Sequence, residues 1–137
     1  MSKQKFHRQN ETHRNERGYK FHALPAGIPT IAELDACLED GSLASTTIHA
    51  HYFLGGFDWY IAAFDPWSGM AYGYVSNAAA PIFSEWGYIS LPEIEALQVK
   101  TPIQMGRATI YLPVVVERDL QWTPRPFEAV RLPVGAR

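Results

Sequence analysis

His49 and His51, two histidines separated by one residue, are the side chains whose type and spacing point most directly to chemistry. Residues 46–53 alternate in polarity and are rich in β-branched and aromatic types, which predicts a strand. Two such histidines project from one face about 7 Å apart and can share a metal ion. A third ligand would have to come from a neighbouring strand, where the candidates are Asp58, Glu85, Glu117 and Asp119. With that ligand unassigned we predict no metal and no cofactor, and a metal-dependent hydrolase built on His49 and His51 is the third functional hypothesis.

A charged cluster, Glu117-Arg118-Asp119, follows the apolar run Val114–Val116. In a regular strand its two carboxylates lie on one face and the guanidinium on the other. An acid/base pair is one interpretation and a binding hot spot is another. We prefer a structural one, in which Arg118 makes a two-point ion pair with a partner such as Glu85 and ties the last strand to the sheet. No residue is assigned to catalysis.

The sequence holds four Trp, seven Tyr and seven Phe, more aromatic residues than so small a core needs. Trp67 stands in a turn between Pro66 and Gly69, which favours an exposed anchor for a protein interface or a base-stacking contact. We predict that Trp67, together with Asp58 and Trp59, takes part in binding.

Residues 1–22 form a basic arm on an acidic body. Six basic residues against Glu11 and Glu16 give the arm a charge of +4. Since the net charge of the chain is -2, the other 115 residues carry a charge of -6. The six are Lys3, Lys5, Arg8, Arg14, Arg17 and Lys20. Because no apolar periodicity is present, we predict a flexible arm. It could be a solvating tail, a phosphate contact through Lys3, Lys5, Arg8, Arg14 and Arg17, or a docking element for an acidic protein surface.

Residues 23–137 are expected to form one domain, since no linker or repeat divides them and a chain of 137 residues can bury its own core. The single cysteine, Cys37, cannot form an internal disulfide, and no segment resembles a signal peptide or a membrane span. We therefore expect a cytoplasmic protein with no membrane partner. The sequence does not indicate an oligomeric state.

Two capping-box patterns predict short helices. Thr30-Ile31-Ala32-Glu33 predicts a helix over 31–40 that ends near Gly41, and Ser90-Leu91-Pro92-Glu93 predicts one over 91–98. The first helix carries an apolar stripe of Ile31, Leu34, Cys37 and Leu38 that should pack on the sheet. Cys37 is accordingly predicted to be buried.

Four strands should follow one another as an antiparallel meander, over residues 46–53, 57–64, 70–76 and 84–90, with a last strand over 114–122. Residues 99–113 contain Pro102, Gly106 and Pro113, so residues 108–112 are left open as a short strand or the rim of a loop. The C-terminal segment should be extended and irregular. The predicted fold is α+β, a four- to five-stranded largely antiparallel sheet with two or three short helices packed on one face.

Several runs in a fixed order resemble a known family. They are Phe57-Asp58-Trp59-Tyr60, Asp65-Pro66, Tyr72-Gly73-Tyr74-Val75, Glu85-Trp86-Gly87-Tyr88-Ile89-Ser90-Leu91-Pro92-Glu93 and Val116-Glu117-Arg118-Asp119-Leu120-Gln121-Trp122. The pattern is similar to a small domain family of unknown function carried on bacterial plasmids, integrative elements and phages, and it covers residues 46–123. Residues 1–22 and 99–111 look longer than the usual form of that family, so features specific to this protein should lie there.

The resemblance implies a gene of a mobile element and no particular activity. Small accessory proteins of such elements often bind host components, including restriction or CRISPR effectors. We therefore expect a non-enzymatic accessory protein that binds a macromolecular partner, most simply a protein, with inhibition of host defence as its most specific form. The alternative is a nucleic-acid-associated protein that uses the basic arm.

Overall fold

The computed structural model describes residues 11–38 and 42–132. Its centre is a five-stranded antiparallel sheet in the order β5-β4-β3-β2-β8. The strands are β2 (Ala50–Leu54), β3 (Phe57–Asp65), β4 (Met70–Asn77), β5 (Glu85–Ser90) and β8 (Glu117–Arg118). The first four form the predicted meander, which confirms the α+β class and the antiparallel sheet.

The predicted first strand is broken in two. β1 (Thr47–Ile48) pairs with β9 (Arg125–Pro126) in the C-terminal segment, whereas β2 begins at Ala50 and joins the main sheet. His49 lies between the two strands. The predicted last strand is likewise shorter, because only Glu117–Arg118 pairs with β2. The C-terminal segment ends in the short 3-10 helix η2 (Phe127–Ala129), and a second one, η1 (Pro81–Phe83), precedes β5.

Two short helices begin at the predicted N-cap residues, but only one of them has the complete capping box. α2 (Ile31–Cys37) begins with a complete capping box between Thr30 and Glu33. α3 (Leu91–Ala96) begins at Ser90, whose hydroxyl accepts a hydrogen bond from the Glu93 N–H. Cys37 is exposed, so its predicted burial is wrong: the apolar stripe of α2 is narrower than predicted, and Leu34 is its buried member.

Two apolar clusters lie on opposite faces of the sheet, as the alternation along β3 requires. Trp59 and Ile61 of β3 join the first cluster with Leu91 of α3, while Tyr60 and Ala62 join the second with Leu34 of α2. The two helices therefore divide between the faces instead of sharing one, which corrects that detail of the prediction. The second cluster is completed by Phe127 and Val130 of the C-terminal segment.

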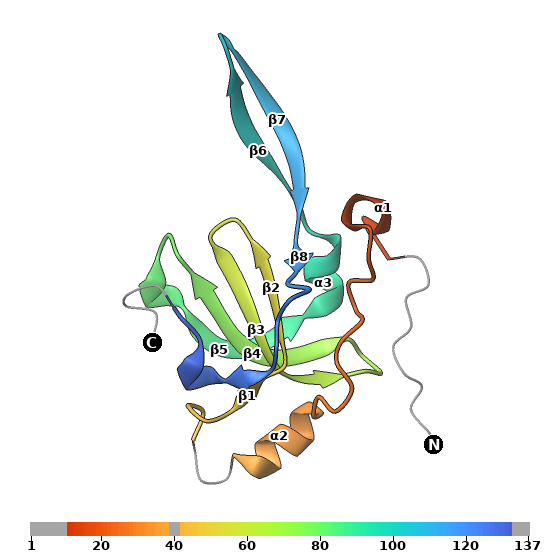
Figure 1. The fold of residues 1–137 in the computed structure, drawn as a ribbon, viewed down its shortest axis with the longest axis vertical. Helices are drawn as coiled ribbons and strands as arrows, with labels where there is room; N and C mark the ends of the chain where they lie inside the picture. The colour runs from red at the N-terminus through yellow and green to blue at the C-terminus, as the bar shows by residue number, and fades with distance from the viewer. Residues whose placement is uncertain (1–10, 39–41, 133–137) are drawn as a thin grey trace.

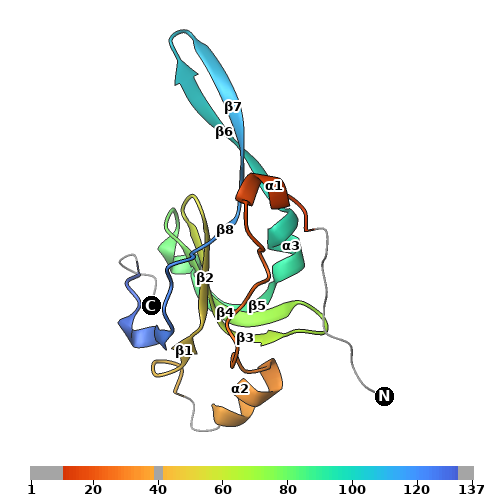
Figure 2. The same cartoon turned by 45° about the vertical axis from the view of Figure 1, so that its right-hand side comes forward.

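The second half of the predicted flexible arm is packed on the body, which corrects that prediction for residues 11–22. This segment includes α1 (Arg14–Arg17) and runs along the side of the sheet that carries α3 (Figure 2). Phe21 has no exposed surface, and it packs in the first cluster beneath Tyr52, whose hydroxyl donates to the Phe21 carbonyl. Residues 1–10 lie outside the described part of the chain.

The segment left open in the sequence is a long hairpin. β6 (Gln98–Met105) and β7 (Ala108–Val115) pair with each other along their whole length and stand away from the five-stranded sheet (Figure 1). Residues 98–115 are called the β6–β7 arm below. The prediction of a short strand or loop rim was thus too small, because Pro102 and Pro113 were taken as breaks.

Candidate functional site

The β6–β7 arm is the largest exposed feature of the described chain. Residues 98–113 are all exposed, and the arm extends beyond the body in both views (Figures 1 and 2). Gly106 opens its two-residue turn with φ 64, a conformation that costs glycine little. At the tip of the arm, Met105 thus pairs directly with Ala108.

The two faces of the arm differ in chemistry. Directly paired residues share a face, so the register places four pairs on one side. This apolar face consists of Val99, Thr101, Ile103, Met105, Ala108, Ile110, Leu112 and Val114. The opposite face carries Gln98, Lys100, Pro102, Gln104, Thr109, Tyr111 and Pro113, and its Gln104 side chain donates to the Thr109 hydroxyl. The apolar face has no charged residue, although it is exposed along almost its whole length.

Two prolines close the edges of the arm. In a hairpin with a two-residue turn, the pair that flanks the turn exchanges both hydrogen bonds, and bonded and non-bonded pairs alternate from there. Counting from Met105 and Ala108 puts Pro102 and Pro113 in non-bonded pairs, where a backbone N–H would point outward. Each strand thus lacks one outward donor, which hinders the addition of another strand at either edge. A partner is therefore expected to meet the arm at a face.

Below the arm is a hollow of about 330 Å³. Phe53, Leu54 and Gly55 at the end of β2 line it, together with Glu16 of α1, Glu117 of β8 and the base of β7, Pro113, Val114 and Val115. Phe53 is one of the exposed large apolar side chains. The hollow therefore lies where the base of the arm meets the end of β2, and Val114 is the residue of the apolar face that reaches it.

His51 is the centre of a compact polar cluster. Its Nε2 lies 2.7 Å from Asp58 Oδ1 and its Nδ1 lies 3.1 Å from Asp119 Oδ2, while the ring stacks on Tyr60 at 4.7 Å. Burial, with the charges of Asp58 and Asp119, raises the pKa of Tyr60 to about 12. The two carboxylates bind opposite sides of one ring, which fixes the ring and separates the carboxylates.

This arrangement does not bring three metal ligands to one point. Among the described residues, no group of three or more His, Cys, Asp or Glu side chains could hold a metal ion. His51 is held by its two carboxylates, whereas His49 lines a separate pocket, and burial lowers the pKa of His49. The two predicted ligands therefore lie in different surroundings.

The predicted ion pair between Arg118 and Glu85 is wrong. β5 and β8 are the two opposite edges of the sheet, so Glu85 and Arg118 are separated by three strands. The Arg118 guanidinium donates instead to the Lys20 carbonyl and lies over the Tyr19 ring. Asp119 pairs with His51, so the charged cluster holds different neighbours from those predicted.

Glu117 binds the N-terminal segment. Its carboxylate accepts a hydrogen bond from the Tyr19 hydroxyl, which itself accepts one from the Arg118 backbone N–H. Burial, followed by that bond to Glu117, raises the pKa of Tyr19 to about 12. Glu117 therefore ties β8 to the N-terminal segment, which was predicted to be flexible.

The predicted binding residues separate into three groups. Trp67 is 37% exposed on the β3–β4 turn, which agrees with a surface position, whereas Trp59 is 8% exposed in the first cluster and cannot anchor a partner. Asp58 is engaged with His51. Arg17, only 7% exposed, is also engaged within the fold, and Arg14 is partly exposed on α1. Lys3, Lys5 and Arg8 lie outside the described residues.

Arg17 is held by three backbone carbonyls. Its guanidinium donates to Val116 at 2.7 Å, Thr12 at 2.9 Å and Glu95 at 2.8 Å, and it lies over the Phe21 ring. Each of the three guanidinium nitrogens thus already donates to a carbonyl within the fold. Arg17 is therefore not available to a phosphate, which removes one of the predicted nucleic-acid contacts.

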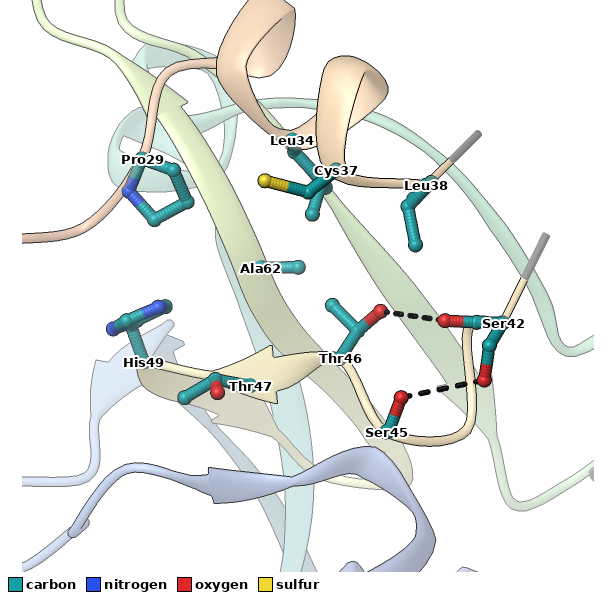
Figure 3. A pocket seen from close by; sticks show the side chains of 10 residues that line it. All are labelled: Pro29, Leu34, Cys37, Leu38, Ser42, Ser45, Thr46, Thr47, His49 and Ala62. Carbon is teal, nitrogen blue, oxygen red and sulfur yellow. Dashed lines mark hydrogen bonds between the residues drawn. The ribbon is translucent and has the colours of Figure 1, made fainter. Parts of the chain in front are cut away.

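A pocket of about 260 Å³ lies between α2 and β1 (Figure 3). Leu34 and Ala62 form its apolar part, and hydroxyl side chains of residues 42–47 line its rim. Cys37 and His49 lie on different sides, with Ala62 between them, so they do not form a thiol–imidazole pair. Nothing in this geometry matches a nucleophile with its base.

No protein-family model, no curated protein and no solved structure matches this chain. The resemblance to a mobile-element domain family therefore stays a prediction. Among the described residues, no helix has both the length and the apolar character needed to cross a membrane.

Proposed function

We propose that this chain is a non-enzymatic binding protein that engages a protein partner through the apolar face of the β6–β7 arm. The observation that supports it is the exposure of that face. The arm forms a separate two-stranded sheet and does not pair with the five-stranded one. Soluble monomers rarely leave a contiguous apolar surface of a few hundred Å² uncovered, and such surfaces commonly mark interaction sites. Closed edges and an open face favour packing of a flat apolar surface on the arm.

The role of an accessory protein of a mobile element remains part of this proposal. It rests on the sequence resemblance alone, and host-defence inhibition is its most specific form. A nucleic-acid role is less favoured, because Arg17 is buried within the fold and the apolar face of the arm carries no positive charge. A hydrolase is less favoured, because the ring nitrogens of His51 already face carboxylates.

Two neighbouring substitutions test the proposal. Ile103→Glu places a carboxylate on the apolar face, and Gln104→Glu adds the same charge one residue further on the opposite face. With the protein immobilised as bait, we expect partner binding to be retained by Gln104→Glu and reduced at least about tenfold by Ile103→Glu, as for a buried interface residue. Equal binding by the wild-type chain, Ile103→Glu and Gln104→Glu would contradict the proposal.

A further inference from the structure

We infer that the apolar face of the β6–β7 arm is covered by the same face of a second copy of this chain. The inference rests on the proposed function, since it names the partner of that surface. An isolated two-stranded hairpin is marginally stable in water unless its apolar face is covered. This arm has eight residues in each strand and no other strand of the described chain pairs with it.

The face is complementary to itself. Its eight side chains are uncharged and, apart from Thr101, apolar, so two copies can meet without placing like charges together. Two sheets pack face to face about 10 Å apart, and the closed edges of the arm leave this mode open. The arm would then supply half of a small four-stranded sandwich.

The buried area is sufficient for a reversible dimer. The large side chains of the apolar face, Val99, Ile103, Met105, Ile110 and Leu112, are each 39–60% exposed. Covering them on two arms buries on the order of 1,000 Å², the lower limit for a specific interface. An interface of this size predicts a dimer that dissociates on dilution.

The bodies fix the direction of the two arms. Each body is much wider than its arm (Figures 1 and 2), so two arms only about 10 Å apart and pointing the same way would bring the bodies into collision. An antiparallel arrangement places the bodies at opposite ends. Met105 at each tip then reaches the base of the other arm, where the hollow lined by Phe53 and Leu54 lies.

Sedimentation equilibrium over a range of protein concentration tests the dimer. We expect the wild-type chain and Gln104→Glu to show a concentration-dependent dimer, and Ile103→Glu to be monomeric. If Ile103→Glu fails to fold, the arm-shortened variant in which Asn-Gly replaces residues 100–113 takes its place. A wild-type chain that stays monomeric, or a dimer that persists in Ile103→Glu or in that replacement, overturns the inference.

Disulfide formation tests the direction. In a Cys37→Ser background, Thr101→Cys near the middle of the arm should cross-link two copies on oxidation, whereas Met105→Cys at the tip should not. Cross-linking at the tip but not at the middle would overturn the antiparallel arrangement. A monomeric wild type whose capture of another protein is still lost in Ile103→Glu would refute the inference and leave the proposed function standing.

Discussion

His51 joins three parts of the fold through one ring. The ring belongs to β2, its Nε2 binds Asp58 of β3, and its Nδ1 binds Asp119, which follows β8. All three side chains were candidate metal ligands in the sequence, yet the sequence could not show that the two carboxylates bind the two nitrogens of one ring. The spacing of His49 and His51 suggested a shared metal, whereas the cross-strand register places Tyr60 beside His51 and brings Asp58 within reach.

Arg17 likewise joins separate parts of the fold through one side chain. Its replacement should lower the stability of the protein. Arg17→Ala leaves three backbone carbonyls without their donor, so we expect the free energy of unfolding to fall by about 3 kcal/mol in urea denaturation. Arg17→Lys should restore only part of it, because a single ammonium cannot reproduce the planar fork. The matched control is Arg14→Ala in the same helix, for which we expect a change of about 0.5 kcal/mol or less. Equal effects at both positions would show that Arg17 does not hold the segment.

At the scale of elements, the meander could be predicted because each strand alternates and each connection carries turn residues. The β6–β7 arm was missed although its apolar residues alternate on both sides of Gly106. Pro102 and Pro113 obscured that pattern, since a proline within a strand usually indicates a break. Both occupy outward-pointing positions, where the absence of an N–H removes no hydrogen bond of the hairpin.

The packing of residues 11–22 was missed for another reason. Its buried members are mainly Glu11, Arg17 and Phe21, two of which are charged. A segment of this composition is expected to be solvated, because buried charges are rare unless they are paired or hydrogen-bonded. Glu11 is in fact bonded to the backbone N–H groups of Phe21 and His22. Such partners come from the tertiary structure and leave no periodic signal in the sequence.

Two glycines that face each other across β4 and β5 should respond in opposite ways to substitution. Gly73 and Gly87 are paired in register, but a Cβ at Gly73 would lie 1.9 Å from the Tyr60 carbonyl oxygen, whereas a Cβ at Gly87 would meet nothing within 4 Å. Gly73 lies opposite the irregularity of β3 between Ile61 and Ala63.

Gly73→Ala should therefore displace the backbone of β3 and lower the free energy of unfolding by about 3 kcal/mol, while Gly87→Ala should change it by about 0.5 kcal/mol or less. Urea denaturation of the two variants measures the difference. If the two alanines proved equally tolerated, the close approach of β3 and β4 at Gly73 would be wrong.

For the molecule as a whole, the two ends of the described chain act as covers for the two faces of one sheet. Phe21 seals the face that holds Tyr52 and Val116, and Phe127 with Val130 seals the other. The β6–β7 arm, by contrast, leaves the sheet and returns to it without adding to either cluster. Stability should thus reside in the body and the two covers, while the arm is free to serve binding.

Two deletions of similar kind should therefore have very different effects. In the first, Asn-Gly replaces residues 100–113 and joins Val99 to Val114, a directly paired position that a two-residue turn can connect. This change removes only exposed side chains, so the melting temperature of the body should change by no more than about 4 °C. Removing residues 1–22 uncovers the first cluster and takes away Arg17, and the cooperative thermal transition should be lost.

Phe21→Ala in the full chain separates the cover from the rest of that segment. Phe21 is fully buried, so this variant should lose about 3–5 kcal/mol while remaining folded or nearly so. Circular dichroism during heating measures the melting temperature of the shortened-arm variant, of the chain without residues 1–22 and of Phe21→Ala. A cooperative transition near the wild-type temperature after removal of residues 1–22 would show that the N-terminal segment is dispensable, and a large loss on shortening the arm would show that the arm supports the body.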